Sequence, residues 1–244
     1  MTTWIIIGAT SAMGEAFARK AAGEGHAIIL TTRKPEDAKL LADDLQIRGA
    51  AAVDTVKLDL GDLNSVPKFV ADVEAIAGEV SVALFAGSMW SQDNVQNDPD
   101  LARRTYMDNL VGPAALLQAL APILEAQSSG TILALSSVAG DRGRASNYTY
   151  GSAKAGFSTF LSGLRNRLAP SEIRVITVKP GFVDTDMTWG LPGLFLVASP
   201  ESVAERLWSA TQKGSEVIYV PGFWWIIMTI IKSIPEPIFK KLKL

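Results

Sequence analysis

Short apolar runs alternate with segments of helical periodicity along most of the chain, and this alternation limits the folds open to it more than any other feature. Because the short runs are apolar throughout, both faces of the sheet that they form must be covered by helices. The sequence therefore predicts an α/β fold of Rossmann type, a doubly wound parallel sheet of about seven strands with helices on both faces. We expect strands near 3–7, 26–31, 53–58, 80–85, 130–136, 173–178 and 216–220, and helices near 12–24, 35–48, 62–77, 98–125, 149–169 and 200–212.

Length and composition narrow the function classes. The 244 residues are 48% apolar, which suffices for one large core, so we expect a single domain over residues 1–221 and an apolar, aromatic tail over 222–244. With no cysteine and one histidine, His26, we expect no metal site and no thiol chemistry. The chain has no long basic run, so we do not expect it to bind nucleic acid. The N-terminus lacks a signal peptide pattern and no segment supplies the ~20 apolar residues of a membrane span, so a cytoplasmic protein is expected.

A glycine turn follows the first predicted strand and opens the first predicted helix. Small residues there let the backbone approach a dinucleotide pyrophosphate, and the helix N-terminus supplies unpaired N–H groups. A plain structural turn is the alternative interpretation. The residues that we expect to contact the pyrophosphate are Gly8, Thr10, Ser11, Ala12, Met13 and Gly14.

Arg33, with Lys34 beside it, stands at the end of the second predicted strand. Proteins that bind NAD often place an acidic residue here for the ribose hydroxyls. A guanidinium instead suits the 2′-phosphate of NADP, which it can bind through two hydrogen bonds. We therefore expect NADP(H) to be preferred, with a solvated basic turn as the alternative.

Three residues carry the predicted chemistry. Tyr150 and Lys154 are four residues apart on a predicted helix and so share one face, and Ser137 ends a strand, where α/β sheets place ligands. Reduction of a ketone needs a proton donor at the carbonyl oxygen. A nearby ammonium group should lower the pKa of the tyrosine from ~10, and a serine hydroxyl can hold the carbonyl.

On these residues the chain resembles the classical short-chain dehydrogenases/reductases over about residues 3–220. The resemblance implies that Tyr150 is the general acid, that Lys154 lowers its pKa and holds the nicotinamide ribose, and that Ser137 orients the carbonyl. Asn109 would hold a water in a proton relay. The other pieces of the match are Asp59 and Leu60 at the adenine, Ala86 and Gly87 after the fourth strand, and Pro180, Gly181, Val183 and Thr185 around the nicotinamide.

Two departures from the family pattern stand out. Ala12 occupies a position of the glycine turn where glycine is usual. Leu84 and Phe85 replace the two asparagines that brace the central sheet in the family, so we expect apolar packing to take over that role.

The stretch from Ser136 to Asn147 and the tail resemble one branch, the decaprenylphosphoryl-2-keto-pentofuranose reductases, which reduce a ketone made by a flavin oxidase. That branch implies a polyprenyl-linked keto sugar as substrate, and Arg142 and Arg144 would meet its phosphates or form surface ion pairs. A reductase of another lipid ketone and a non-catalytic NADP-binding sensor are the alternatives. An apolar lid over Met187, Trp189, Leu191, Leu194, Phe195 and Leu196 would suit either ketone.

The tail joins an aromatic and apolar run, Phe223 to Ile231, to terminal lysines. Such a segment suits the membrane interface, where lysines meet anionic lipid. A contact in a homo-oligomer is the other interpretation. A cytoplasmic enzyme that touches the inner face of the membrane and an oligomer in solution thus remain as alternatives.

Overall fold

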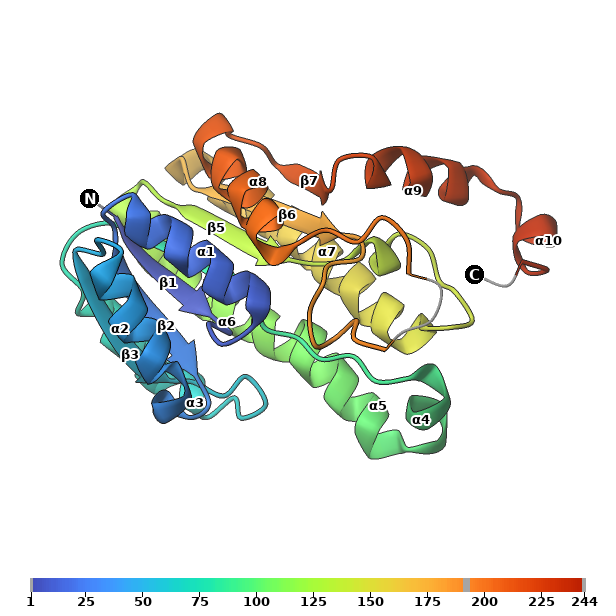
Figure 1. Cartoon of the computed structure of the whole chain (residues 1–244), viewed down its shortest axis with the longest axis horizontal. Coiled ribbons are helices and arrows are strands. Elements are labelled where there is room, and N and C mark those ends of the chain that lie inside the picture. Colours follow the sequence, from blue (N-terminus) through green and yellow to red (C-terminus); the bar gives the residue numbers. More distant parts are fainter. Residues whose placement is uncertain (1, 191–193, 243–244) are drawn as a thin grey trace.

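The computed structural model describes residues 2–190 and 194–242. Seven parallel strands form one sheet in the order β3-β2-β1-β4-β5-β6-β7, which confirms the predicted fold (Figure 1). The strands are β1 (Thr3–Ile7), β2 (Ala27–Thr32), β3 (Ala52–Lys57), β4 (Val80–Leu84), β5 (Thr131–Leu135), β6 (Arg174–Pro180) and β7 (Val217–Val220). Each predicted strand agrees with an observed one to within two residues.

Helices cover both faces of the sheet because side chains along each strand alternate between them. In β1, Ile6 packs in the core under α1 (Ala12–Gly23), α2 (Lys39–Ile47) and α8 (Pro200–Lys213). Its neighbour Ile7 packs in the core under α3 (Ser65–Glu74), α6 (Gly112–Gln127) and α7 (Tyr148–Leu168). The sheet is therefore buried on both sides, as its continuous apolar strands require.

The helix predicted over 98–125 is interrupted. It consists of α5 (Pro99–Tyr106), a π-helical segment (Met107–Val111) and α6. Pro113 has no N–H to donate to the carbonyl of Asn109, so a regular α-helical turn cannot form there. By length and composition, Pro99–Gln127 is nevertheless long and apolar enough to cross a membrane, contrary to the sequence expectation. Its buried leucines, Leu116, Leu117, Leu120 and Leu124, pack in the core.

Several short elements were not predicted. A short helix, α4 (Gln92–Asn97), precedes α5, and 3-10 turns occupy Pro35–Ala38, Val138–Gly140 and Ala169–Ser171. The tail forms two helices, α9 (Trp224–Ser233) and α10 (Glu236–Phe239), which lie beyond the end of β7 (Figure 1). Of the predicted lid and tail residues, Leu191, Lys243 and Leu244 lie outside the described residues.

Candidate active site

The strand order reverses between β1 and β4, and a cleft opens at the carboxyl ends of these strands, as expected for an open α/β sheet. Its larger part has a volume of about 260 Å³ and its smaller part about 70 Å³. Phe85, Ala86 and Gly87 line both parts, so the two form one continuous site.

The larger part contains the residues predicted for the adenosine and pyrophosphate of a dinucleotide. Of the predicted set, Gly8, Thr10, Ser11, Arg33, Asp59, Leu60, Ala86 and Gly87 line it. Ala12 and Gly14 lie in the same turn but do not line the cleft. Thr31, Thr32, Ser88 and Asp108 also line it and were not predicted, because they belong to no motif that the sequence displays.

The glycine turn has the geometry of a phosphate cradle. Gly8 has a φ of +76°, and a Cβ on it would lie 2.8 Å from the backbone nitrogen of Ala86, so only glycine fits. Ser11 caps α1, since its Oγ accepts a hydrogen bond from Gly14 N at 3.1 Å. A phosphate fits beside this helix N-terminus. Arg33 is exposed at the cleft and forms no ion pair with another described residue, so its guanidinium is available to a further phosphate.

The smaller part brings together the predicted catalytic residues and the predicted nicotinamide contacts. Its lining includes Met13, Ser137, Tyr150, Lys154, Pro180, Gly181, Val183 and Thr185. Gly140 explains how the loop after Ser137 comes so close to α7. A Cβ at this position would lie 2.8 Å from the backbone nitrogen of Ala155, so the loop can pack directly on the helix backbone.

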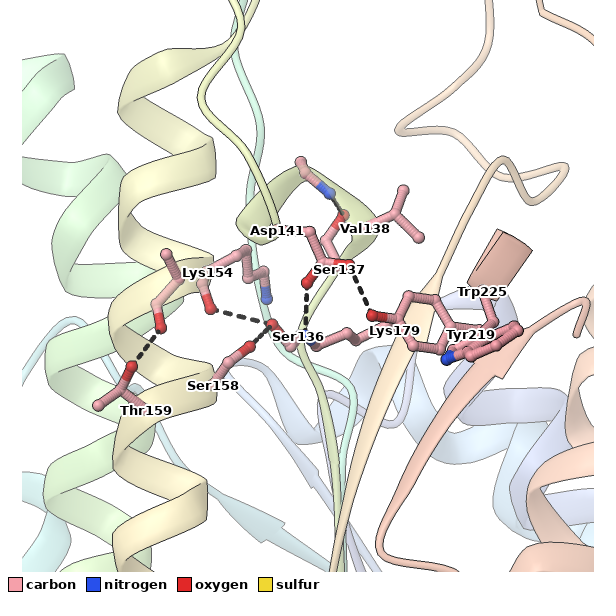
Figure 2. A network of polar contacts seen from close by, with 12 residues as sticks. Ser136, Ser137, Val138, Asp141, Lys154, Ser158, Thr159, Lys179, Tyr219 and Trp225 are labelled. Carbon is pink, nitrogen blue, oxygen red and sulfur yellow. Dashed lines mark hydrogen bonds and ion pairs between the residues drawn. The ribbon is translucent and has the colours of Figure 1, made fainter. Parts of the chain in front are cut away.

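Hydrogen bonds on either side of Ser137 hold its loop (Figure 2). The hydroxyl of Ser136 donates to the carbonyl of Lys154 at 3.0 Å and contacts the hydroxyl of Ser158 at 2.6 Å. Ser137 Oγ accepts from Ala139 N at 3.1 Å. Ser137, the predicted catalytic serine, is therefore fixed between β5 and α7.

Tyr150 and Lys154 are both deeply buried, with 9% and 4% of their surfaces exposed. Burial raises the pKa of Tyr150 to about 12, and a hydrogen bond from Ser137 lowers it in part. Burial lowers the pKa of Lys154 to about 8. Desolvation is the larger influence at both groups, so the expectation that Lys154 lowers the pKa of Tyr150 stays a prediction.

Lys154 Nζ lies 5.8 Å from the centre of the Tyr150 ring and donates to the carbonyl of Leu135 at 3.1 Å. Asn109 Nδ2 donates to the carbonyls of Ser88 and Thr105, at 2.7 and 2.9 Å. Its buried Oδ1 has no protein partner. Asn109 Oδ1 and Lys154 Nζ lie 2.8 and 3.4 Å from the point where a Cβ on Gly87 would stand. This free acceptor beside the lysine fits the water site that the family resemblance implies.

Two further predictions concern residues next to this set. Phe85 is 6% exposed and packs on Phe17 at 5.5 Å between ring centres, so apolar packing does replace the family's asparagines. Arg142 does not point to a substrate phosphate. It binds backbone carbonyls of the tail and forms an ion pair with Glu236 at 3.0 Å. Arg144 donates to the carbonyl of Val138 at 3.3 Å.

Comparisons with known proteins agree with this geometry. The short chain dehydrogenase family model matches residues 2–192. An uncharacterized oxidoreductase of Mycobacterium tuberculosis is 31% identical over 98% of this chain and 96% of its own length. The chain therefore belongs to the short-chain dehydrogenase/reductase family.

Two solved structures share the fold. One is a short-chain dehydrogenase from Sphingobium yanoikuyae in complex with NADPH, with a TM-score of 0.83, 23% identity and 97% of each chain covered. The other is an alcohol dehydrogenase from Thermococcus sibiricus complexed with 5-hydroxy-NADP. It has a TM-score of 0.78 and 23% identity, with 90% of this chain and 96% of that chain covered.

Proposed function

We propose that the protein is an NADP(H)-dependent carbonyl reductase that converts a ketone to an alcohol. The observation that carries the proposal is that Ser137 and the buried pair Tyr150 and Lys154 lie together at one end of a cleft whose other end holds the glycine turn and Arg33. The two NADP-type ligands of the structural neighbours support the choice of cofactor.

The residues of the cleft fit the dinucleotide along its length. Backbone N–H groups at the Gly8–Met13 turn would hold the pyrophosphate, and Arg33 the 2′-phosphate. Asp59 and Leu60 would lie at the adenine, and Pro180, Val183 and Thr185 at the nicotinamide. When bound, the reduced nicotinamide supplies the hydride.

The protein supplies the proton. The Ser137 hydroxyl donates a hydrogen bond to the substrate carbonyl oxygen and orients it. With a pKa of about 12, Tyr150 keeps its proton at neutral pH and transfers it to that oxygen as the alcohol forms. The ammonium form of Lys154, over the ring, stabilises the phenolate that results. Asn109 Oδ1 would hold the water through which Tyr150 regains a proton.

The cofactor assignment is tested by titration with NADPH and NADH. We expect NADPH to bind more tightly, and Arg33→Ala to weaken NADPH binding by about ten- to a hundred-fold while leaving NADH binding unchanged. Lys34→Ala is the matched control, because Lys34 is an equally exposed neighbouring cation that does not line the cleft. Equal affinity of the wild type for both cofactors would contradict the assignment.

For the substrate we propose a polyprenyl-linked 2-keto sugar, produced by a partner flavin oxidase. Support comes from the resemblance of the Ser136–Asn147 stretch and from the exposed apolar side chains Met187 and Trp189 near the catalytic end of the cleft. The alternative is another lipid ketone. Loss of NADPH absorbance with the lipid-linked keto sugar, a water-soluble ketone and a long-chain 3-keto lipid, at equal concentration, separates the two. Absence of turnover with every ketone would instead favour a cofactor-binding sensor.

A further inference from the structure

Helix α9 is apolar on both of its faces. Trp224 and Met228, only 2% and 0% exposed, pack on Val138, Phe182 and Tyr219. The opposite face carries Trp225, Ile226 and Ile230, which are 56–61% exposed. We call these three residues the outer apolar face. A helix that is apolar all round is normally covered on every side, so this face lacks a partner within the described chain.

The active-site loop holds the tail in a fixed orientation. Arg142, five residues after Ser137, donates to the carbonyls of Ile231 and Ile234 at 2.6 and 2.5 Å, where α9 ends. The same guanidinium lies 3.7 Å from the centre of the Phe239 ring in α10. Helices α9 and α10 are thus attached to the catalytic loop, and their orientation relative to the cleft is set by these contacts.

The inner face of α9 lies against the wall of the cleft. Gly181 lines the catalytic part of the cleft, and a Cβ on it would overlap the Trp224 indole. Phe195, 50% exposed, packs on Trp224 with 5.6 Å between ring centres. The inner face of α9 and Phe195 therefore pack together beside the catalytic end of the cleft, and the outer apolar face lies on the opposite side of the same helix.

The net charge of the tail indicates which kind of partner covers the outer apolar face. Residues 222–244 carry four lysines and one glutamate, a net charge of +3, whereas the whole chain has −2, which leaves −5 for residues 1–221. Lys232 in α9 and Lys240 and Lys241 after α10 are all exposed. A symmetric contact between two copies would bring these like charges together. An anionic lipid surface would attract them and cover tryptophan and isoleucine in its interfacial region.

We propose that the outer apolar face of α9, with the exposed lysines of the tail, docks on an anionic membrane surface and holds the catalytic end of the cleft close to the bilayer. The docking does not depend on the reaction that the cleft performs, so a failure of one proposal leaves the other standing.

Flotation of the full chain with lipid vesicles tests the proposal. We expect the wild type to float with vesicles of phosphatidylglycerol and phosphatidylcholine, and much less with phosphatidylcholine alone. The triple variant Trp225→Ser/Ile226→Ser/Ile230→Ser should stay in solution. The double variant Leu40→Ser/Ile47→Ser is the control, since it removes two apolar side chains that are 83% and 86% exposed on α2, and it should float like the wild type.

A second variant isolates the charge. Lys232→Gln/Lys240→Gln/Lys241→Gln should weaken binding to the anionic vesicles about a hundred-fold, at about fivefold for each lysine, and leave cofactor binding unchanged. Retained binding of NADPH by both triple variants checks that they fold. The proposal is overturned if the wild type stays in solution, or if the serine triple variant still floats. A dimer in solution that the serine variant dissociates, with no flotation of the wild type, would assign the face to a second copy.

Discussion

The protein contains two tyrosine–lysine pairs on either side of the same loop, and they differ in the charge that accompanies them. Lys154, beside Tyr150, has a backbone carbonyl as its hydrogen-bond acceptor and no carboxylate among the described residues. Lys179 and Tyr219 instead share the buried carboxylate of Asp141 (Figure 2). Lys179 Nζ donates to Oδ1 of Asp141, and the Tyr219 hydroxyl donates to Oδ2 of Asp141 at 2.7 Å.

We expect this difference to separate a reactive pair from a structural one. Burial lowers the pKa of Lys154, and no carboxylate among the described residues offsets this effect. The ammonium charge therefore has no carboxylate partner and can stabilise a phenolate at Tyr150. In the second cluster the carboxylate compensates the lysine, and both burial and the bond to Asp141 raise the pKa of Tyr219 above its ordinary value. Because Asp141 follows Ser137 by four residues, the neutralised cluster ties the ends of β6 and β7 to the catalytic loop.

The largest expected effect is on turnover. Tyr150→Phe removes the proton donor and should lower the rate of NADPH-dependent ketone reduction about 10²- to 10⁴-fold, while NADPH still binds. The rate is measured by NADPH absorbance and binding by fluorescence titration. Tyr219→Phe is the matched control and should keep the wild-type rate. A Tyr150→Phe rate above about a tenth of that of the wild type would remove the basis for distinguishing the two tyrosines.

The next effect is on stability. Asp141→Asn leaves the Lys179 ammonium, whose side chain is 15% exposed, without its counter-charge, and should lower the free energy of unfolding by about 3 kcal/mol. Urea denaturation measures the change. Asp72→Asn, at an exposed position with no ion pair among the described residues, should change stability little. If both variants were equally stable, Asp141 would not be compensating a buried charge.

Lys154→Met should change turnover and stability in opposite directions. It abolishes the stabilisation of the phenolate, but it also removes a buried cation. The folded-state pKa, about 8, lies below the ordinary value of 10.5, so the charged lysine destabilises the fold fully below pH 8. The variant should gain up to about 3 kcal/mol there.

That gain should shrink as the pH rises from 8 toward 10.5, because the wild-type lysine is then neutral in the fold. Urea denaturation at pH 7 and at pH 10 makes the comparison. A methionine variant less stable than the wild type at pH 7 would mean that the Leu135 carbonyl compensates the ammonium.

The smallest effect is expected for Tyr219→Phe. It removes one hydrogen bond to Asp141 and keeps the ion pair with Lys179, so stability should fall by about 1 kcal/mol. Thermal unfolding at neutral pH measures this loss. A loss as large as that of Asp141→Asn would show that the phenol, and not the lysine, is what the carboxylate holds.

Local patterns predicted the sheet and the cleft well. Runs such as Trp4–Ile7 are apolar because they are buried on both sides, and the glycine turn is required by its own backbone geometry. Each of these features can therefore be predicted from a few consecutive residues. The positions of Ser137, Tyr150 and Lys154 follow from one strand end and one helix face in the same way.

Contacts between distant segments could not be predicted. Asp141, Lys179 and Tyr219 come from three separate elements, and none stands in a pattern that indicates the others. For Arg142 the sequence leaves a substrate phosphate and a surface ion pair open, and it does not indicate the actual partners, which lie 89–94 residues further along the chain. The π-helical turn that holds Asn109 also depends on a single proline in a pattern that otherwise predicts a continuous helix.

The attachment of Arg142 to the tail has a consequence for the order in which the enzyme matures during translation. The carbonyls and the ring that hold this guanidinium are synthesised about 90 residues after it, at roughly 5–20 residues per second. For several seconds the nascent chain therefore contains the glycine turn, Tyr150 and Lys154, while the carbonyls of Ile231 and Ile234 that accept hydrogen bonds from Arg142 have not yet been made. The contacts that hold this loop against the tail can therefore form only after nearly the whole chain has been synthesised.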